Sequence, residues 1–186
     1  LRRRRGESKS SRRSAVERYL DHALWQSVLD YIDTMPQDSA RERQHHERVR
    51  WLFRLLYGAA LRASEVAQAK SGDIELRRGK WWLRVTGKGD VEGDVPISDE
   101  LMADLARYRR FYGLSAVPIA QEQAPLIMSI AGRADRFLTS TAIYLIVKEV
   151  FRRAADQLEA SDSSKAVTLR RASTHWLRHT AATHQA

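Results

Sequence analysis

The stretch THWLRHT at residues 174–180, near the end of the sequence, places an imidazole and a guanidinium three positions apart. On a helix, residues at i and i+3 share a face, so His175 and Arg178 would act on the same group. A proton-transfer group beside a bidentate cation suits a reacting phosphate, because one handles protons while the other neutralises oxygens that gain charge. A lone His-x-x-Arg is more often a solvated helix face, so this interpretation depends on the rest of the chain.

Apolar periodicity predicts that most of the remaining chain is helical. Four segments carry apolar residues at three- and four-residue spacing, and several of them begin at a residue suited to cap a helix. These helices are predicted from Asp21 to before Pro36 and over 39–60, 99–111 and 139–158. The polar stretch 161–168 is predicted to be a loop, and His45 and His46 are expected on a solvated helix face.

Between residues 73 and 98 the pattern changes to that of short strands. Turns at 77–80 and 87–90 divide this region into three antiparallel strands. Lys88 lies between two glycines at a hairpin tip, where the backbone can approach a partner and the ammonium can project past the sheet. A turn lysine normally serves solubility, so Lys88 alone does not indicate a site. The predicted fold is α+β and mostly α-helical, with a small three-stranded antiparallel sheet.

The stretch YGAALRASEV at residues 57–66 surrounds one arginine with small and apolar residues. Burying a guanidinium costs several kcal/mol unless it is paired. Arg62 is therefore expected either to meet Glu65 or to face an anion in a cleft. The plainer alternative is an exposed pair of Arg62 and Glu65 within one helix.

The composition indicates a globular protein with a polyanionic partner. The 186 residues are 43% hydrophobic, include five Trp, and carry a formal net charge of +9. This length supports one domain with a core. No apolar run approaches the roughly 18 residues of a membrane span, and no secretory signal is expected. The absence of cysteine excludes disulfides, thiolate nucleophiles and Cys-based zinc sites, and it is compatible with a reducing cytosol.

Most of the positive charge lies in residues 1–15. Seven basic residues against one acidic residue give this segment +6, which leaves +3 for the remainder. Because it is rich in Arg, Ser and Gly with little to bury, it is predicted to be a disordered arm or interdomain linker. It is either a solubilising tail or a segment that follows a phosphate backbone. The missing initial Met suggests that the chain was cut from a longer protein.

A metal site is a weaker interpretation of the last helix. His175 and His179 are four residues apart, with His184 nearby, and this spacing allows two imidazoles to share a metal. No zincin motif is present and no carboxylate lies between them. We expect no metal, and the sequence also lacks a Walker loop and a dinucleotide fingerprint.

Three motifs in order resemble the catalytic domain of the tyrosine recombinases, the phage-integrase family. Arg62 with Glu65 follows an apolar helix, Lys88 lies on a hairpin, and His175-x-x-Arg178 opens a late helix. Each motif is common, but their order and their placement on helix, hairpin and helix are specific. The resemblance covers residues 16–186 as a catalytic domain, with residues 1–15 as the basic arm or linker.

The resemblance implies DNA cleavage and rejoining through a 3′-phosphotyrosyl intermediate, without metal, ATP or another cofactor. Arg62 and Arg178 would hold the non-bridging oxygens and stabilise the transition state. Lys88 would protonate the leaving 5′-oxygen, and His175 would assist proton transfer at the nucleophile. Glu65 and His179 would have supporting roles.

The expected DNA contacts lie in the arm and before the last helix. They are Arg2, Arg3, Arg4, Arg5, Arg12, Arg13, Arg170 and Arg171. The resemblance implies double-stranded DNA as the partner, an oligomer on DNA when full length, no membrane, and a cytoplasmic location at a bacterial or phage-associated nucleoid.

The sequence departs from the family pattern in three places. Ala60 stands where the family often has Gly, and three acidic residues, Asp90, Glu92 and Asp94, follow the hairpin tip where basic residues are frequent. The nucleophilic tyrosine is expected a few dozen residues beyond Arg178, but the last tyrosine here is Tyr144. Tyr108, Tyr112 and Tyr144 have helical spacings that suit core packing, and Tyr57 belongs to the helix before Arg62. We therefore expect a C-terminally incomplete catalytic domain with its nucleophile outside this chain, inactive for cleavage on its own.

Two alternatives remain beside a site-specific recombinase or integrase. One is a non-catalytic DNA-binding module that retains the phosphate clamp. The other is a type IB topoisomerase, which shares the clamp and the tyrosine chemistry. A tyrosine in a longer native form favours an enzyme, and relaxation of DNA without sequence requirement favours the topoisomerase.

Overall fold

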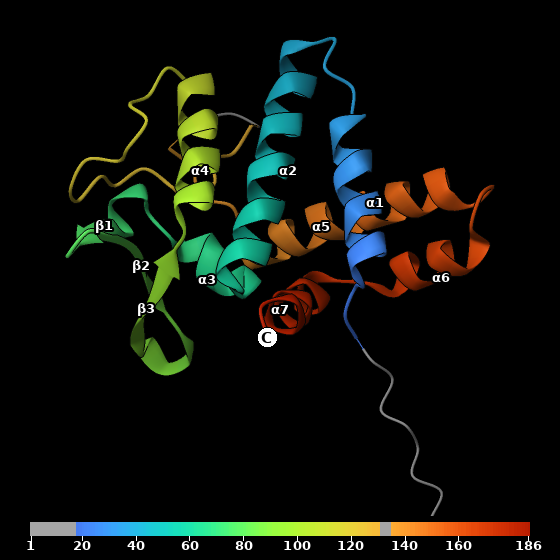
Figure 1. The fold of residues 1–186 in the computed structure, drawn as a ribbon. Helices are drawn as coiled ribbons and strands as arrows, with labels where there is room; N and C mark the ends of the chain where they lie inside the picture. The colour runs from blue at the N-terminus through green and yellow to red at the C-terminus, as the bar shows by residue number, and fades with distance from the viewer. Residues whose placement is uncertain (1–17, 131–134) are drawn as a thin grey trace, which may run out of the picture.

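The computed structural model describes residues 18–130 and 135–186, which form a bundle of helices with a small sheet on one side (Figure 1). The helices are α1 (His22–Asp33), α2 (Ala40–Ala59), α3 (Ala63–Gln68), α4 (Asp99–Phe111), α5 (Ser140–Leu158), α6 (Ser163–Arg171) and α7 (Thr174–His184). The strands are β1 (Ile74–Arg77), β2 (Lys80–Thr86) and β3 (Glu92–Ile97). The predicted α+β class is confirmed.

Side-chain caps explain where the main helices begin. The Asp21 carboxylate accepts a hydrogen bond from the Leu24 amide, and Thr139 caps α5 in the same way. Ser39 and Glu42 form a reciprocal capping box at the start of α2. Each cap satisfies amides that the first helical turn leaves without partners. The helix starts predicted from these residues are therefore confirmed.

Helix α2 forms the centre of the core. Its side chains at Trp51, Leu52, Phe53, Leu55 and Leu56 are almost completely buried. Figure 1 shows α4 and α1 on either side of α2, and α7 also packs against it. The Trp51 indole donates to the Leu126 carbonyl at 3.1 Å, which joins α2 to the buried segment before α5. An apolar helix surrounded on several sides is buried on more than one face.

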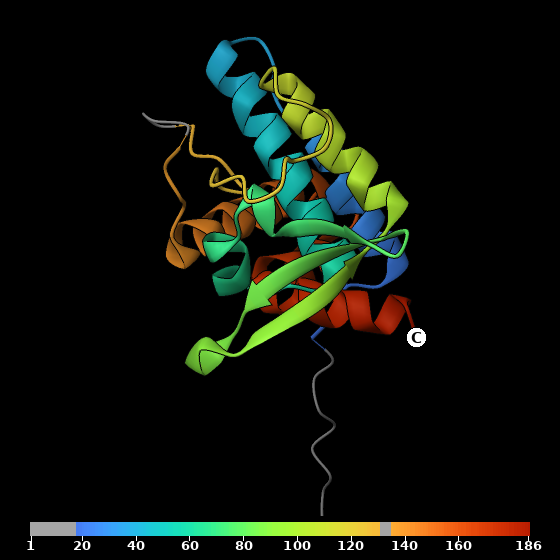
Figure 2. The same cartoon turned by 90° about the vertical axis from the view of Figure 1, so that its left-hand side faces the viewer.

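The three strands pair antiparallel in the order β1-β2-β3, as predicted. Figure 2 shows the β2–β3 hairpin extending away from the helices to a tip at Lys88–Asp90. At the tip, Gly89 has φ 75°, a left-handed conformation that favours glycine. The sheet thus carries Lys88 on a projecting turn.

Three expectations from the sequence are wrong. Residues 161–168 do not form a loop, because α6 begins after the Asp162 cap and buries Ala166 and Leu169. His46 is not solvated but only 3% exposed. Tyr144 is not in the core: it is 43% exposed on α5. In each case a short-range pattern was compatible with two environments, and the packing of neighbouring elements decided between them.

No helix in the described ranges is long and apolar enough to cross a membrane.

The segment entering α1 is tied to α7 by one buried hydroxyl. Thr180 is fully buried, and its Oγ1 accepts from the Leu20 amide at 2.8 Å while donating to the Trp176 carbonyl. This bond joins residues 160 positions apart. It therefore helps to hold α7, the helix predicted to carry His175 and Arg178, in place.

We predict that Thr180→Val lowers the free energy of unfolding by about 1–3 kcal/mol, because the buried Leu20 amide loses its acceptor while the side-chain shape is kept. Urea denaturation measures the loss. The control is Thr183→Val on the exposed face of the same helix, which we expect to have little effect. Equal changes in the two variants would show that the buried bond contributes nothing specific.

Candidate active site

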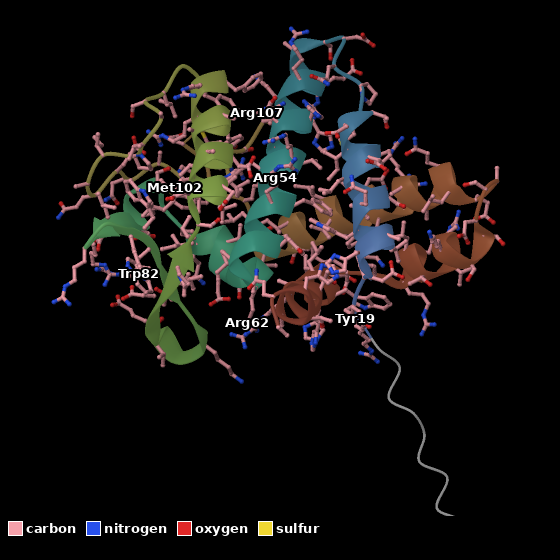
Figure 3. The ribbon with its side chains drawn as sticks, in the orientation of Figure 1. Tyr19, Arg54, Arg62, Trp82, Met102 and Arg107 are labelled. Carbon is pink, nitrogen blue, oxygen red and sulfur yellow. The ribbon has the colours of Figure 1, made fainter. Side chains whose placement is uncertain are left out.

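A surface hollow of about 350 Å³ opens where α3 and α7 begin. It is lined by two short stretches of chain, Leu61–Ser64 on one side and Thr174, His175 and Arg178 on the other. Figure 3 shows Arg62 on the lower side of the molecule beside α7. The structure thus brings together three of the four side chains predicted to be catalytic, from positions more than 100 residues apart in sequence.

Backbone geometry at the end of α2 presents Arg62 to the hollow. Ala60 ends the helix in a left-handed conformation, with φ 52° and ψ 40°. This conformation costs an L-residue about 1 kcal/mol, which explains why glycine suits this position. The chain then turns, and Arg62 becomes the N-cap residue of α3.

Glu65 holds the backbone of Arg62 and not its guanidinium. The Arg62 amide donates to Glu65 Oε1 at 2.8 Å. The Arg62 side chain is exposed, and within residues 18–130 and 135–186 it forms no ion pair. Neither the predicted buried pair nor the predicted intrahelical pair of side chains is present. Of the expected alternatives, a guanidinium facing a cleft is the one that the structure contains.

His175 and Arg178 lie on one face of α7, as the i, i+3 spacing predicts. The Nε2 atoms of His175 and His179 are 2.9 Å apart, so one ring donates and the other accepts. Both rings cannot be protonated in this arrangement. Partial burial first, then His179 and Arg178, lower the pKa of His175 below its ordinary value of 6.5. The site is therefore cationic and holds a neutral imidazole near pH 7.

Lys88 does not line the hollow. It is exposed at the tip of the β2–β3 hairpin, as predicted from the flanking glycines. In Figures 1 and 2 this tip and α7 both lie on the lower side of the molecule. The ammonium is thus carried on the side of the molecule where the hollow opens, but on a separate element.

The predicted DNA contacts before α7 differ from each other. Arg170 forms ion pairs with Glu159 at 2.6 Å and Asp156 at 2.9 Å, so its charge is already compensated. Arg171 is exposed, and the described part of the chain offers it no ion pair. The contacts predicted for Arg2, Arg3, Arg4, Arg5, Arg12 and Arg13 lie outside the described residues.

The sequence analysis missed two polar residues that line the hollow and one that lies near His175. The hydroxyls of Ser64 and Thr174 line it together with the two arginines. Arg18 lies close enough to His175 to contribute to lowering its pKa. Ser64 and Thr174 each lie within four residues of a predicted site residue, which was the available signal, but the position of Arg18 follows only from the packing of the entry segment on α7.

The tyrosines of this chain lie outside the hollow. All six tyrosines fall within the described ranges, and none lines the hollow. Tyr57 bonds His184 Nδ1 at 3.0 Å, and Tyr108 is buried where it accepts from the Met128 amide. Among the described residues, no group of three or more His, Asp or Glu side chains could hold a metal ion.

We predict that sulfate bound in the hollow raises the pKa of His175, because an anion stabilises the imidazolium form. In the free chain the pKa is below 6.5, so sulfate should bind more tightly as pH falls through that value. NMR titration of the ring protons, at constant ionic strength with and without sulfate, measures the change. His184 is the internal control, because its pKa is also lowered but it lies outside the hollow. An equal shift of both histidines would contradict a specific anion site.

Comparison with known proteins agrees with this geometry. The model of the phage integrase family matches residues 18–186. Tyrosine recombinase XerD of Xanthomonas axonopodis is 31% identical over 169 residues, which cover 91% of this chain and 51% of the relative. Tyrosine recombinase XerA of Pyrococcus furiosus is 26% identical over 180 residues, 96% of this chain and 52% of the relative. The chain thus spans about half the length of these two relatives.

Solved structures show the same fold. XerH site-specific recombinase, bound to a palindromic difH substrate in a post-cleavage complex, superimposes with a TM-score of 0.60 at 24% identity. The match covers 90% of this chain and 41% of XerH. XerA recombinase gives a TM-score of 0.58 at 18% identity, over 89% of this chain and 49% of the other. Because the family model covers nearly all of the described residues, the chain belongs to the phage integrase family of tyrosine recombinases.

Proposed function

We propose that this chain is the catalytic domain of a site-specific recombinase that cuts and rejoins duplex DNA through a 3′-phosphotyrosyl link. The observation that carries the proposal is the convergence of Arg62, His175 and Arg178 on one exposed hollow. Two guanidiniums without carboxylate partners among the described residues leave positive charge for a phosphate to neutralise. Family membership supports the same conclusion.

In this proposal the two arginines hold the non-bridging oxygens of the scissile phosphate. They come from different helices, so they would grip the phosphate from two directions. Charge grows on these oxygens in the pentacoordinate transition state, and fixed donors stabilise that charge without reorganisation. Glu65 supports the clamp by fixing the backbone amide of Arg62, which leaves the guanidinium free.

His175 and Lys88 would move the protons. A neutral His175 accepts the proton of the attacking hydroxyl, and the lowered pKa keeps it neutral near pH 7. His179 orients the imidazole through the contact between the two Nε2 atoms. Lys88 would protonate the leaving 5′-oxygen when DNA lies along the side that carries both the hollow and the hairpin tip.

The nucleophile in this proposal is a tyrosine outside residues 1–186. In-line attack needs the oxygen about 3–3.5 Å from phosphorus. None of the six tyrosines lines the hollow, and the hydroxyls of Tyr57 and Tyr108 are engaged elsewhere. Residues 16–186 would then be an incomplete catalytic domain, with residues 1–15 as the arm that follows the DNA backbone. Assembly as an oligomer on DNA and a location at the nucleoid belong to the same proposal.

We predict that Arg178→Lys, in a form of the protein that cleaves DNA, reduces cleavage by about 10²–10³ while duplex binding changes little. Lysine keeps the charge but loses the planar fork that grips two oxygens. Single-turnover cleavage and a binding titration separate the two effects. Arg110→Lys, an exposed arginine on α4 outside the hollow, is the control and should change neither. Equal losses of binding and cleavage would indicate a plain DNA-contact role.

We predict that residues 1–186 alone form no covalent adduct with a nicked suicide substrate, whereas a longer native form containing the nucleophile does. Denaturing electrophoresis of labelled DNA measures the adduct. An adduct on the exposed Tyr144 would show that the nucleophile is within this chain. If no native form cleaves DNA, the chain is a binding module that retains the clamp. Relaxation of supercoiled DNA without a sequence requirement would assign it to the topoisomerases.

A further inference from the structure

A second cavity, of about 410 Å³, lies between the end of α1, the first half of α2 and the middle of α5. Its walls combine apolar side chains with charged ones of both signs, among them Met35, Val150, Arg41, Arg48, Glu42 and Glu149. Arg48 precedes the end of α2 by about 11 residues, which at 1.5 Å per residue places the cavity roughly 17 Å along the helix from the turn before Arg62. In Figure 1 the α1–α2 turn and α7 are at opposite ends of the molecule. The cavity is therefore separate from the candidate active site.

Arg48 is a buried cation without a counter-ion among residues 18–130 and 135–186. The residue is only 8% exposed. Its Nη2 donates a hydrogen bond to His45 Nδ1 at 3.0 Å. The Nε atom is sealed from solvent without a hydrogen-bond partner, and no described carboxylate forms an ion pair with the guanidinium. Burial lowers the pKa of Arg48, which reflects the cost of the uncompensated charge.

The other buried arginine shows how this fold normally compensates such a charge. Arg109 is 2% exposed, and Glu122 accepts from its Nη1 at 2.6 Å and its Nη2 at 3.0 Å. Its Nε also donates to the Ser115 carbonyl at 2.6 Å. The described part of the chain offers Arg48 one acceptor, His45 Nδ1. Burial lowers the pKa of His45, so this ring does not supply a compensating charge. Arg48 therefore lacks, in the part of the chain that the structure describes, a carboxylate such as the one that Arg109 has.

The remaining charges of the cavity do not supply this carboxylate. Glu149 accepts from both Arg153 and Arg152, each at 2.7 Å. Glu42 accepts the Ser39 amide in the capping box of α2. Arg41 is exposed and, within the described ranges, forms no ion pair. An anion entering the cavity would thus meet one unpaired buried guanidinium, with a second one at its edge.

The walls and the charge together define the ligand. One buried guanidinium matches a singly charged planar carboxylate, because the two carboxylate oxygens can accept two parallel N–H hydrogen bonds from it. A phosphate dianion carries a second charge, whereas Arg153 is already paired with Glu149 and Arg41 is exposed at the edge of the cavity. Met35 and Val150 would cover a hydrocarbon body attached to the carboxylate. We propose that this cavity binds a carboxylate carried on an apolar body, with Arg48 as its counter-ion.

The probe for this proposal is 4-phenylbutyrate, titrated into residues 1–186 and followed by NMR shifts of the amides around the cavity. The uncharged 4-phenylbutyramide has the same shape without the anion and should bind at least about tenfold more weakly, because it loses a charge-assisted hydrogen bond. A blocked tripeptide, acetyl-Leu-Glu-Phe-amide, offers the same carboxylate from a protein chain. Tighter binding of the peptide identifies a protein as the source of the carboxylate, and tighter binding of the free acid identifies a small molecule.

Arg48→Met separates a ligand-binding role from a structural one. We expect it to abolish probe binding and to raise the midpoint of thermal unfolding by about 2–4 °C, because an unpaired buried charge is replaced by an apolar side chain of similar length. Arg110→Met on the exposed face of α4 is the matched control and should change neither. Arg41→Met, at the exposed edge of the cavity, should fold normally and weaken binding severalfold.

The proposal is overturned if the amide binds as tightly as the acid, or if Arg48→Met leaves acid binding unchanged. It is also overturned if Arg48→Met lowers the midpoint of thermal unfolding by about 2–4 °C instead of raising it, since Arg48 would then stabilise the fold. If Arg48→Met does not fold, an unchanged affinity in Arg41→Met would count against the site. None of these results depends on DNA cleavage, so they are distinct from a failure of the proposed recombinase function.

Discussion

The burial of α2 is the constraint on which the rest of the structure depends. Its apolar side chains contact helices on several sides, and α1, α4, α5, α7 and β3 all pack against it. The turn that follows α2 presents Arg62, and the helix beside its end carries His175 and Arg178. The hollow between them is therefore a consequence of how α7 packs on α2. A substitution that moved α7 would separate the two arginines even if both were retained.

The distribution of ion pairs distinguishes structural arginines from those available to a ligand. Arg50 and Arg54 share Asp104, Arg107 contacts Glu47, and Arg109 is held by Glu122. These pairs join α2, α4 and the loop that follows α4. By contrast, Arg62, Arg178 and Arg48 have no carboxylate partner among the described residues. Other arginines, such as Arg171, are also unpaired among the described residues, but these three line the hollow or the cavity, where an external anion would be stabilised.

The two proposed sites differ in how their cations are exposed. Arg62 is solvent-exposed at the rim of an open hollow, which suits a large polyanion that approaches from outside. Arg48 is buried beside a cavity with apolar and charged walls, where a single small anion would be partly desolvated on binding. The first arrangement favours rapid electrostatic attraction, and the second favours selection by shape and by charge. The same residue type therefore serves different chemistry because of its surroundings.

Local signals in the sequence were sufficient to predict most of the secondary structure and to single out the arginines proposed to hold a phosphate. Asp21, Ser39 and Thr139 mark helix starts because a cap depends only on residues within one turn. The hairpin at Lys88 and the shared face of His175 and Arg178 also follow from short-range geometry. Residues 161–168 were assigned to a loop because α6 is short and its two buried residues gain their environment only by packing on α5.

Only the tertiary structure decided which charges meet. The sequence placed Arg62 near Glu65 but did not show that the carboxylate would hold the backbone amide and leave the guanidinium free. It treated His46 as solvated and Tyr144 as buried, and both were reversed by the elements that pack around them. The residues proposed to be catalytic were singled out by the sequence, because their motifs are local. Their convergence, and the isolation of Arg48 from any described carboxylate, were decided by contacts between distant segments, because burial and charge pairing depend on neighbours that local sequence does not specify.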